Sequence, residues 1–301
     1  MAANTTISWA RHTGNLWWGC QEVHAGCANC YARVWASRWG KSLWGQGGRQ
    51  VIKSVWADLA RFQREAAALG EVHRVFVGSM MDIFEKPHPL VDAQGQPLAG
   101  DTGALRTRFF EQVVPASPNL QFLLLTKRPG NIAKYVPAAW LSRPPTNVLY
   151  GYSVVDKASL RELAKLVAVP GRRFASLEPL LAPLDLTPWL GPAGVEWVIV
   201  GGESGAGRCA QRPIQPLHPA WARALRAQCQ AAGVAFHFKQ HGEYQEVPAG
   251  APAQAGDRWL RLDGTLAPGP EPAPAVRVRR VGSREAGHLL DGQHYLGFPA
   301  A

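Results

Sequence analysis

The fold class of this chain is indicated most clearly by residues 121–126, QFLLLT, which are followed by KRPG at 127–130. Such a near-continuous apolar run is typical of a parallel strand that is covered on both faces. Similar runs recur, and helix-like segments lie between them, which indicates βα units and a parallel sheet. The other expected strands are 74–79 (RVFVGS), 147–153 (NVLYGYS), 173–177 (RFASL), 196–201 (EWVIVG) and 235–239 (AFHFK). The expected helices are 55–69, 105–116, 131–136, 158–167 and 218–232.

The repeated units, with a further strand available near the N-terminus, favour an α/β fold: a partial or complete (β/α) TIM-like barrel with parallel strands. No G-x-G-x-x-G follows the first strand, so the dinucleotide fingerprint of an open doubly wound sheet is missing. We expect residues 1–245 to form the barrel. Residues 246–301 begin with Pro- and Gly-rich sequence and are expected to form a basic appendage packed on the barrel. Residues 85–104 are expected to be a long polar loop.

Composition excludes several classes of protein. The chain has 301 residues, of which 47% are hydrophobic and 18% charged, unlike a disordered chain. No apolar run is long enough to cross a bilayer, and the first residues are not those of a secretory signal, so we expect a cytoplasmic protein with no membrane association. The formal net charge of +10 favours a polyanionic partner such as DNA or RNA.

Three of the five cysteines, Cys20, Cys27 and Cys30, lie in one loop at residues 19–32 with the spacing C-x6-C-x2-C. Three thiolates can hold three irons of a [4Fe–4S] cluster and leave the fourth iron open for chemistry. The alternative is a structural zinc site in which His24 or His12 is the fourth ligand. Cys209 and Cys229 do not form a second C-x2-C pair, which favours the cluster.

The whole chain resembles the phage Gp37/Gp68-type, three-Cys-motif (DUF5131-like) proteins. The resemblance is carried by ISW, GCANCYA, LLTKRP, GYSV, SLEPLL, WVIVGGESG, AGVAFHFKQHG and VGSREAGHLLDG, which begin at residues 7, 26, 124, 151, 176, 197, 232 and 281. Members of this family are similar to radical S-adenosylmethionine enzymes. The cysteine spacing here is three residues longer than the commonest C-x3-C-x2-C of that superfamily.

The resemblance implies two cofactors, a [4Fe–4S] cluster and S-adenosylmethionine, and an external electron donor that reduces the cluster. It implies an enzyme that generates a 5′-deoxyadenosyl radical, which we expect to act in the modification or repair of a nucleic acid or nucleotide. The alternative is a zinc-stabilised, non-catalytic nucleic-acid-binding accessory protein that acts beside a partner protein encoded nearby.

Polar residues follow several strands, and in a parallel barrel the working groups collect at those strand ends. The expected catalytic residues are Glu178 and Lys239, although a plain salt bridge is the alternative for Lys239. Asp82 and Asp156 could instead cap helices. The residues expected to bind the cofactor are Ser79, Asp82, Ser153, Asp156, Gly201, Gly202 and Glu203.

Cations in two places could bind phosphates, because Arg offers a bidentate fork and Lys a point charge. The alternative in both places is a solvated surface. The expected nucleic-acid-binding residues are Lys127, Arg128, Arg277, Arg279 and Arg280. Tyr31, Trp35 and Trp39 recur every four residues after the cysteine loop, which favours a helix face packed on the core over a base-stacking platform.

Overall fold

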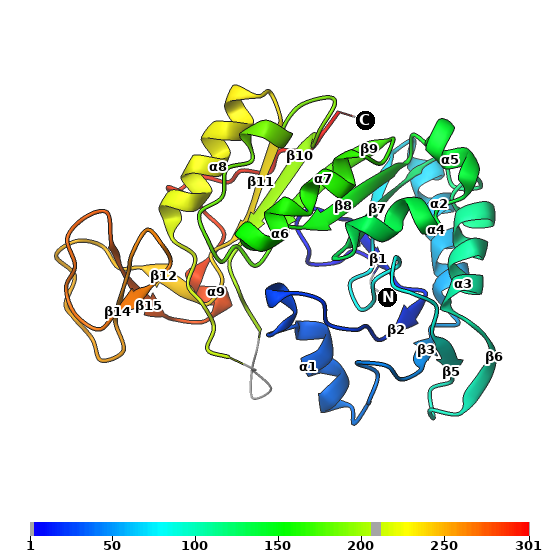
Figure 1. The fold of residues 1–301 in the computed structure, drawn as a ribbon, viewed down its shortest axis with the longest axis horizontal. Helices are drawn as coiled ribbons and strands as arrows, with labels where there is room; N and C mark the ends of the chain where they lie inside the picture. The colour runs from blue at the N-terminus through cyan, green and yellow to red at the C-terminus, as the bar shows by residue number, and fades with distance from the viewer. Residues whose placement is uncertain (1–2, 206–211, 301) are drawn as a thin grey trace. The chain divides into compact units, whose positions relative to one another are not determined.

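The computed structural model describes residues 3–205 and 212–300. Its main sheet has seven strands in the hydrogen-bonding order β1-β4-β7-β8-β9-β10-β11 (Figure 1). The pairs β1–β4, β4–β7, β7–β8 and β10–β11 are parallel. The strands are β1 (His12–Gly14), β4 (His73–Val77), β7 (Leu120–Thr126), β8 (Val148–Ser153), β9 (Arg172–Leu177), β10 (Trp197–Gly201) and β11 (Ala235–Gln240).

The strand order of this sheet follows the chain order without a reversal. A doubly wound sheet would reverse at a switch point, whereas successive right-handed crossovers in one direction build a (β/α) barrel. Within the described residues no ladder joins β1 to β11, so the sheet is open. The predicted α/β fold of the partial-barrel type is therefore confirmed.

The helices between these strands are mostly short. The longest, α2 (Val55–Leu69), has the predicted bounds, and its buried residues Val55, Leu59, Phe62 and Ala66 lie on one face. The others are α3 (Thr102–Arg108), which continues as a π-helix over Phe109–Val113, α4 (Ile132–Tyr135), α5 (Ala138–Ser142), α6 (Lys157–Arg161), α7 (Leu163–Val167) and α8 (Pro219–Ala231). No helix among the described residues is long and apolar enough to span a bilayer.

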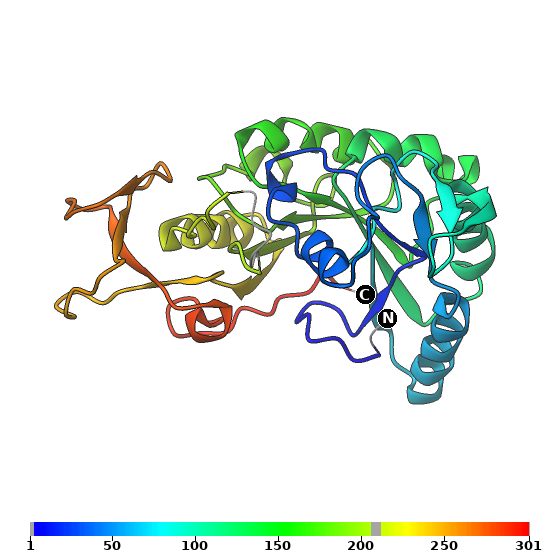
Figure 2. The same cartoon turned by 90° about the horizontal axis from the view of Figure 1, so that it is seen from below.

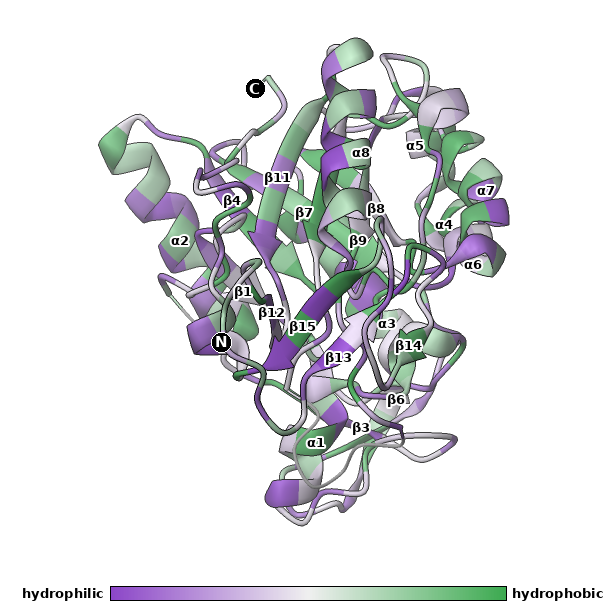
Figure 3. Ribbon diagram, turned by 90° about the vertical axis from the view of Figure 1, so that its left-hand side faces the viewer, coloured by the Kyte–Doolittle hydropathy of each residue, from purple (hydrophilic) through white to green (hydrophobic). Residues whose placement is uncertain are grey.

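The chain divides into two compact units. The first contains residues up to His24, Ala32–Tyr152 and Ala164–Phe174, and the second contains Ala25–Tyr31, Ser153–Leu163 and the chain from Ala175 onward. Buried residues of the main-sheet strands form much of the core of each unit. These strands are largely hydrophobic in Figure 3. The domain boundary predicted near residue 245 stays a prediction.

The expectation of a loop over residues 85–104 is wrong. Strands β5 (Pro89–Val91) and β6 (Pro97–Asp101) form an antiparallel hairpin there. The Asp92 carboxylate accepts hydrogen bonds from the backbone N–H groups of Gln94 and Gln96, which closes the turn. The hairpin joins β2 (Trp17–Trp18) and β3 (Arg49–Val51) in a second sheet of order β2-β3-β5-β6.

A third sheet lies in the second unit, in the orange part of the chain in Figure 2. Its strand order is β12-β15-β13-β14. Its longest strand, β15, carries the predicted basic residues. The elements are β12 (Tyr244–Glu246), β13 (Arg258–Leu260), β14 (Leu266–Ala267), β15 (Val276–Arg280) and, after them, α9 (Ser283–Ala286).

Helix α1 (Tyr31–Arg38) follows the cysteine loop. The expectation that Tyr31, Trp35 and Trp39 pack on the core is wrong, because all three are exposed. The buried residues of this helix are Ala32, Val34 and Ala36. The aromatic repeat has the spacing of a helix face, but among the described residues no core covers that face.

Candidate functional site

The three-cysteine motif is divided between the two units. Cys20 follows β2 in the first unit, whereas Cys27 and Cys30 belong to the second. All three side chains are free of disulfides. Within residues 3–205 and 212–300, no group of three or more His, Cys, Asp or Glu side chains is arranged to hold a metal ion. Shared metal binding by the three cysteines therefore stays a prediction. Cys209 lies outside the described residues.

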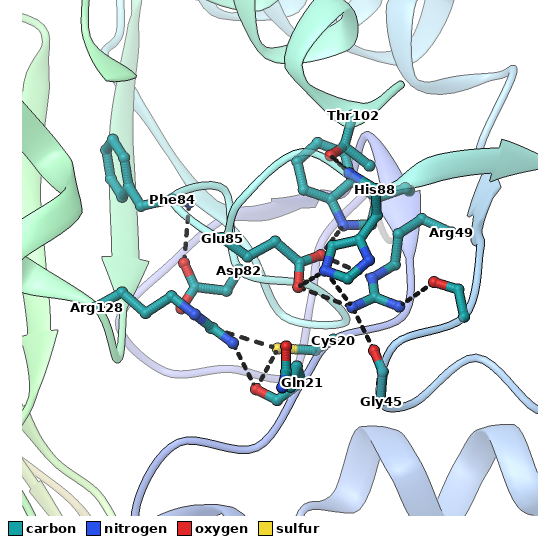
Figure 4. Close-up of polar contacts among 12 residues, drawn as sticks. Cys20, Gln21, Gly45, Arg49, Asp82, Phe84, Glu85, His88, Thr102 and Arg128 are labelled. Carbon is teal, nitrogen blue, oxygen red and sulfur yellow. Dashed lines mark hydrogen bonds and ion pairs between the residues drawn. The ribbon is translucent and has the colours of Figure 1, made fainter. Parts of the chain in front are cut away.

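The backbone of Cys20 is hydrogen-bonded to a neighbouring loop, and a cation lies close to its thiol. Its carbonyl accepts a hydrogen bond of 3.0 Å from the Gly45 N–H, and it forms a β-bridge with Trp44. The Arg128 Nη1 lies 3.8 Å from its Sγ (Figure 4). Burial raises the pKa of the Cys20 thiol to about 12, with Asp82 adding to the effect and Arg128 opposing it.

The buried Asp82 and the partly buried Arg128 form an ion pair beside Cys20, with Asp82 Oδ2 2.8 Å from Arg128 Nη1 (Figure 4). The same carboxylate accepts hydrogen bonds from Thr126 Oγ1 at 2.7 Å and from the Lys127 N–H at 3.0 Å. Burial works to lower the pKa of Arg128, but Asp82 and Cys20 outweigh it and the pKa ends above its usual value. Asp82 thus ties the end of β4 to the end of β7 and caps no helix.

The contacts of Arg128 within the protein compete with its predicted role in phosphate binding. Its Nη2 donates to the Gln21 carbonyl at 2.6 Å, while its Nη1 contacts Asp82 and Cys20. Both arms of the guanidinium are therefore taken by protein groups. A phosphate would have to displace one of them.

Sequence reasoning missed another ion pair, which is fully buried, between Arg49 and Glu85. Arg49 Nε lies 2.8 Å from Glu85 Oε1, and both side chains are inaccessible to solvent (Figure 4). Arg49 also donates to the carbonyls of Gly45 and Gly47, and Trp17 donates to Glu85. The available signal was Glu85 itself, because a carboxylate in the apolar context MMDIFE needs a cationic partner when it is buried.

This pair fixes the loop that holds Cys20. Arg49 binds the Gly45 carbonyl at 3.0 Å, and the Gly45 N–H binds the Cys20 carbonyl. Gly19 has a φ of +124°, and a Cβ at this position would lie 2.5 Å from the Leu43 carbonyl oxygen. The backbone at Gly19 therefore requires glycine for both its conformation and its close packing.

Ser79, predicted to bind the cofactor, lies in the same unit at the end of β4. Its hydroxyl accepts a hydrogen bond of 2.7 Å from Asn15 Nδ2, and the Met80 N–H donates to Asn15 Oδ1 at 2.8 Å. The Gly19 N–H donates to the Met80 carbonyl. The segment after β4 and the segment that leads to Cys20 are thus bound together.

His12, the possible fourth ligand of a zinc site, has another role. It is buried and stacks on Phe62 with ring centroids 3.9 Å apart. Its Nε2 lies 3.1 Å from His73 Nδ1, and its Nδ1 accepts a hydrogen bond from the Asn4 N–H. Both ring nitrogens are therefore taken by protein contacts.

In the second unit, the loop of Cys27 and Cys30 is connected to the predicted cofactor-binding loop. Asn29 Nδ2 donates to the Arg212 carbonyl at 3.2 Å. Arg212 holds the buried Glu203 through two contacts of 2.8 Å, one to each carboxylate oxygen. This chain of contacts connects one half of the cysteine motif with the end of β10.

Gly202 sits where no side chain fits, since a Cβ there would overlap the His241 carbonyl group. The Gly202 N–H donates to the Gln240 carbonyl at 2.9 Å, which joins the ends of β10 and β11. Gly201 packs against the side chain of Glu178, where an added Cβ would be 3.4 Å from its Cδ. These glycines allow close approach between backbones.

Glu178 and Lys239, the predicted catalytic pair, lie together at the ends of β9 and β11. Lys239 Nζ is 2.5 Å from Glu178 Oε1, and both side chains are partly exposed. Gln240 Nε2 also donates to Glu178 Oε1, at 3.3 Å. The salt bridge considered for Lys239 is present, and it places a cation and a carboxylate at the strand ends.

Ser153 is the last residue of β8 and Asp156 follows that strand, and both belong to the second unit. Ser153 is buried. Asp156 caps α6: its carboxylate accepts a hydrogen bond of 2.8 Å from the Ser159 N–H, and Ser159 Oγ accepts one from the Asp156 N–H. The helix-cap alternative for Asp156 is confirmed by this capping box.

The predicted phosphate-binding arginines of β15 are paired with carboxylates. Arg279 Nε lies 2.7 Å from Asp257 Oδ1, and Arg277 contacts the same carboxylate at 3.8 Å. Arg280 pairs with Glu243 at 2.5 Å. The basic charge of this strand is therefore largely balanced within the protein.

The parallel sheet and its polar strand-end clusters define an α/β protein of the partial-barrel class. The family model of DUF5131, described as a protein of unknown function, matches residues 4–299, and the chain belongs to this family. No curated protein matches the chain in sequence. Among solved structures, the chain is similar to a mutant of spore photoproduct lyase with bound AdoMet and dinucleoside spore photoproduct. The identity is 12% and the TM-score 0.40, and the match covers 82% of this chain and 68% of that chain.

Proposed function

We propose that this protein is an iron–sulfur enzyme of the radical S-adenosylmethionine type that modifies or repairs a nucleic acid or nucleotide. The observation that carries the proposal is the set of three free thiols, Cys20, Cys27 and Cys30, on a single short loop. One half of that loop is bound to Arg128, which follows β7, and the other half is bound to Arg212, which pairs with Glu203 after β10. Thiolates are the ligands that iron–sulfur clusters prefer.

In this proposal the three cysteines would hold a [4Fe–4S] cluster, and the cluster, reduced by an external donor, would supply the electron for cleavage of S-adenosylmethionine. Arg128 and Asp82 orient the segment of Cys20, and Arg212 and Glu203 orient the segment of Cys27 and Cys30. The residues proposed to line the cofactor site are Ser79, Asp82, Ser153, Asp156, Gly201, Gly202 and Glu203.

Glu178 and Lys239 are proposed to hold and move a proton at the substrate. The Lys239 ammonium and the Glu178 carboxylate share a contact of 2.5 Å, and both are open to solvent in part. In such a pair the Lys239 ammonium can donate a proton to the substrate, and the Glu178 carboxylate can accept one. Loss of either partner should impair turnover more than cofactor binding.

The proposal is tested by anaerobic reconstitution with iron and sulfide, followed by iron, sulfide and zinc analysis. We expect about four irons per chain and their loss in Cys20→Ala, Cys27→Ala and Cys30→Ala. The matched control is Cys229→Ala, because this buried thiol on α8 belongs to the core and should not affect iron binding. Stoichiometric zinc without iron uptake would show a zinc-stabilised protein instead.

Cofactor use is tested separately on the iron-loaded protein. Dithionite reduction in the presence of S-adenosylmethionine should yield 5′-deoxyadenosine, and the cofactor should perturb the electron-paramagnetic-resonance signal of the reduced cluster. A full cluster that neither binds nor cleaves the cofactor would contradict the radical assignment.

A further inference from the structure

Two tryptophans project from the region of α1 and are left exposed. Trp35 is 54% exposed and Trp39 69% exposed, and they stand four residues apart in the chain, so they lie on one side of the helical turn. The ring centroid of Trp18 lies 6.4 Å from that of Trp35 and supports it from one side. Large exposed aromatic rings gathered in this way mark a binding surface.

The chain segment that carries these rings has charge of one sign. Residues 23–57 contain no Asp or Glu and contain the cations Arg33, Arg38, Lys41, Arg49 and Lys53. Three of these cations have protein partners: Arg33 pairs with Glu22, Lys41 donates to the Ala93 carbonyl, and Arg49 is buried against Glu85.

Arg38 and Lys53 are the two cations of this segment that remain exposed, and neither makes an ion pair with a described residue. Arg38 lies between Trp35 and Trp39 in the chain. By contrast, Arg128 and the arginines of β15 are already paired with carboxylates. The combination of exposed rings and available positive charge therefore occurs at α1.

We infer that the surface formed by Trp35, Arg38 and Trp39 binds single-stranded nucleic acid. The tryptophan rings stack on unpaired bases, and Arg38 contacts the phosphate backbone. Stacking requires base faces that a duplex keeps covered, so the preferred ligand is a single strand. The inference names a binding surface for the nucleic acid that the proposed function takes as its substrate. In that respect it rests on the proposed function.

The test measures the fluorescence anisotropy of a labelled oligo(dT) of about 15 nucleotides against duplex DNA of the same length. We expect Trp35→Ala and Trp39→Ala each to weaken single-strand binding on the order of tenfold, since each stacked base contributes about that much. Trp39→Phe should restore much of the affinity. Arg38→Ser should lower the slope of log K against log salt by about 0.7.

Matched controls lie on α2 in the same unit. Leu69 and Arg64 are exposed there, so Leu69→Ala and Arg64→Ser remove an apolar side chain and a cation from a different surface. Both should bind oligo(dT) as the unchanged protein does. Circular dichroism melting curves identify any variant that fails to fold.

Three results would overturn the inference. The first is single-strand binding that the tryptophan substitutions leave unchanged, and the second is duplex binding of equal strength. The third is a dimer in light scattering that Trp35→Ala and Trp39→Ala dissociate, which would assign the surface to a second copy of the chain. Binding is measured with and without iron loading, so a protein that takes up no iron but binds the oligonucleotide contradicts the proposed function alone.

Discussion

Arg49 and Glu85 illustrate how one buried pair can organise a site. Burial raises the pKa of Glu85, and Arg49 opposes that shift by hydrogen bonding and charge. Arg49 uses its other donors on the carbonyls of the loop that holds Cys20. The pair is costly to break, because removal of one partner leaves the other charge buried without compensation.

Replacement of Arg49 by Met should therefore destabilise the protein by about 3–5 kcal/mol, as measured by urea unfolding. The double variant Arg49→Met/Glu85→Leu should recover a large part of that loss, because it removes both charges. Arg61→Met is the control, since Arg61 forms exposed ion pairs on α2 and its loss should barely move the unfolding midpoint. A double variant as unstable as Arg49→Met would show that carbonyl binding, and not the ion pair, holds the loop.

Among the elements, α6 shows how a short helix begins at a strand end. It spans only Lys157–Arg161, and such a helix depends on its cap because it has few internal hydrogen bonds. The capping box of Asp156 and Ser159 supplies partners for the first N–H groups. The contacts of Asp156 thus show a structural role as a helix cap. Its role in cofactor binding is a proposal.

Substitutions of Asp156 separate those two roles. Asp156→Ala should cost about 1 kcal/mol of stability, whereas Asp156→Ser keeps a capping oxygen and should cost little. If Asp156 also contacts the cofactor, Asp156→Ser should weaken S-adenosylmethionine binding, measured by calorimetry, without loss of stability. Lys157→Ala is the control, because it changes the neighbouring exposed residue and keeps the cap. Unchanged cofactor affinity in Asp156→Ser would show that Asp156 caps the helix and does not bind the cofactor.

For the molecule as a whole, stability should depend on buried neutral histidines in the first unit. Burial and the neighbouring Arg49 lower the pKa of His88 to about 4. Burial and His73 lower the pKa of His12 to about 4. In the unfolded chain both groups take up protons near pH 6.5, so the unfolded state binds more protons between pH 6.5 and 4. The contribution of each neutral histidine is complete above pH 6.5 and is lost as the pH falls toward 4.

We therefore expect the free energy of unfolding to drop between about pH 7 and about pH 4.5, with His88 responsible for about 2–3 kcal/mol of the loss. In His88→Gln the side-chain oxygen can still accept from Arg49, whose Nη2 lies 3.2 Å from His88 Nε2, and the drop should be smaller by that amount. Urea titrations across this pH range measure the difference. Parallel curves for the two proteins would show that His88 does not titrate on unfolding.

The α/β class and the strand positions could be predicted from the sequence, because buried parallel strands are continuous apolar runs that can be recognised without knowledge of their neighbours. Strand β7 was expected at 121–126 and occupies Leu120–Thr126, and α2 has its predicted bounds. The cysteine motif was equally plain, since a ligand spacing is a local property of the chain. The hairpin of β5 and β6 was missed because its strands are short and carry polar residues.

Which charged side chains are available to a ligand depends on the folded arrangement of the chain. Arg128 and the arginines of β15 looked like phosphate ligands in the sequence, but distant carboxylates, Asp82 and Asp257 among them, neutralise them. The periodicity of Trp35 and Trp39 showed that they share a helix face, but periodicity cannot show whether another element covers that face. Pairing and burial are long-range properties, because they depend on which segments the fold brings together.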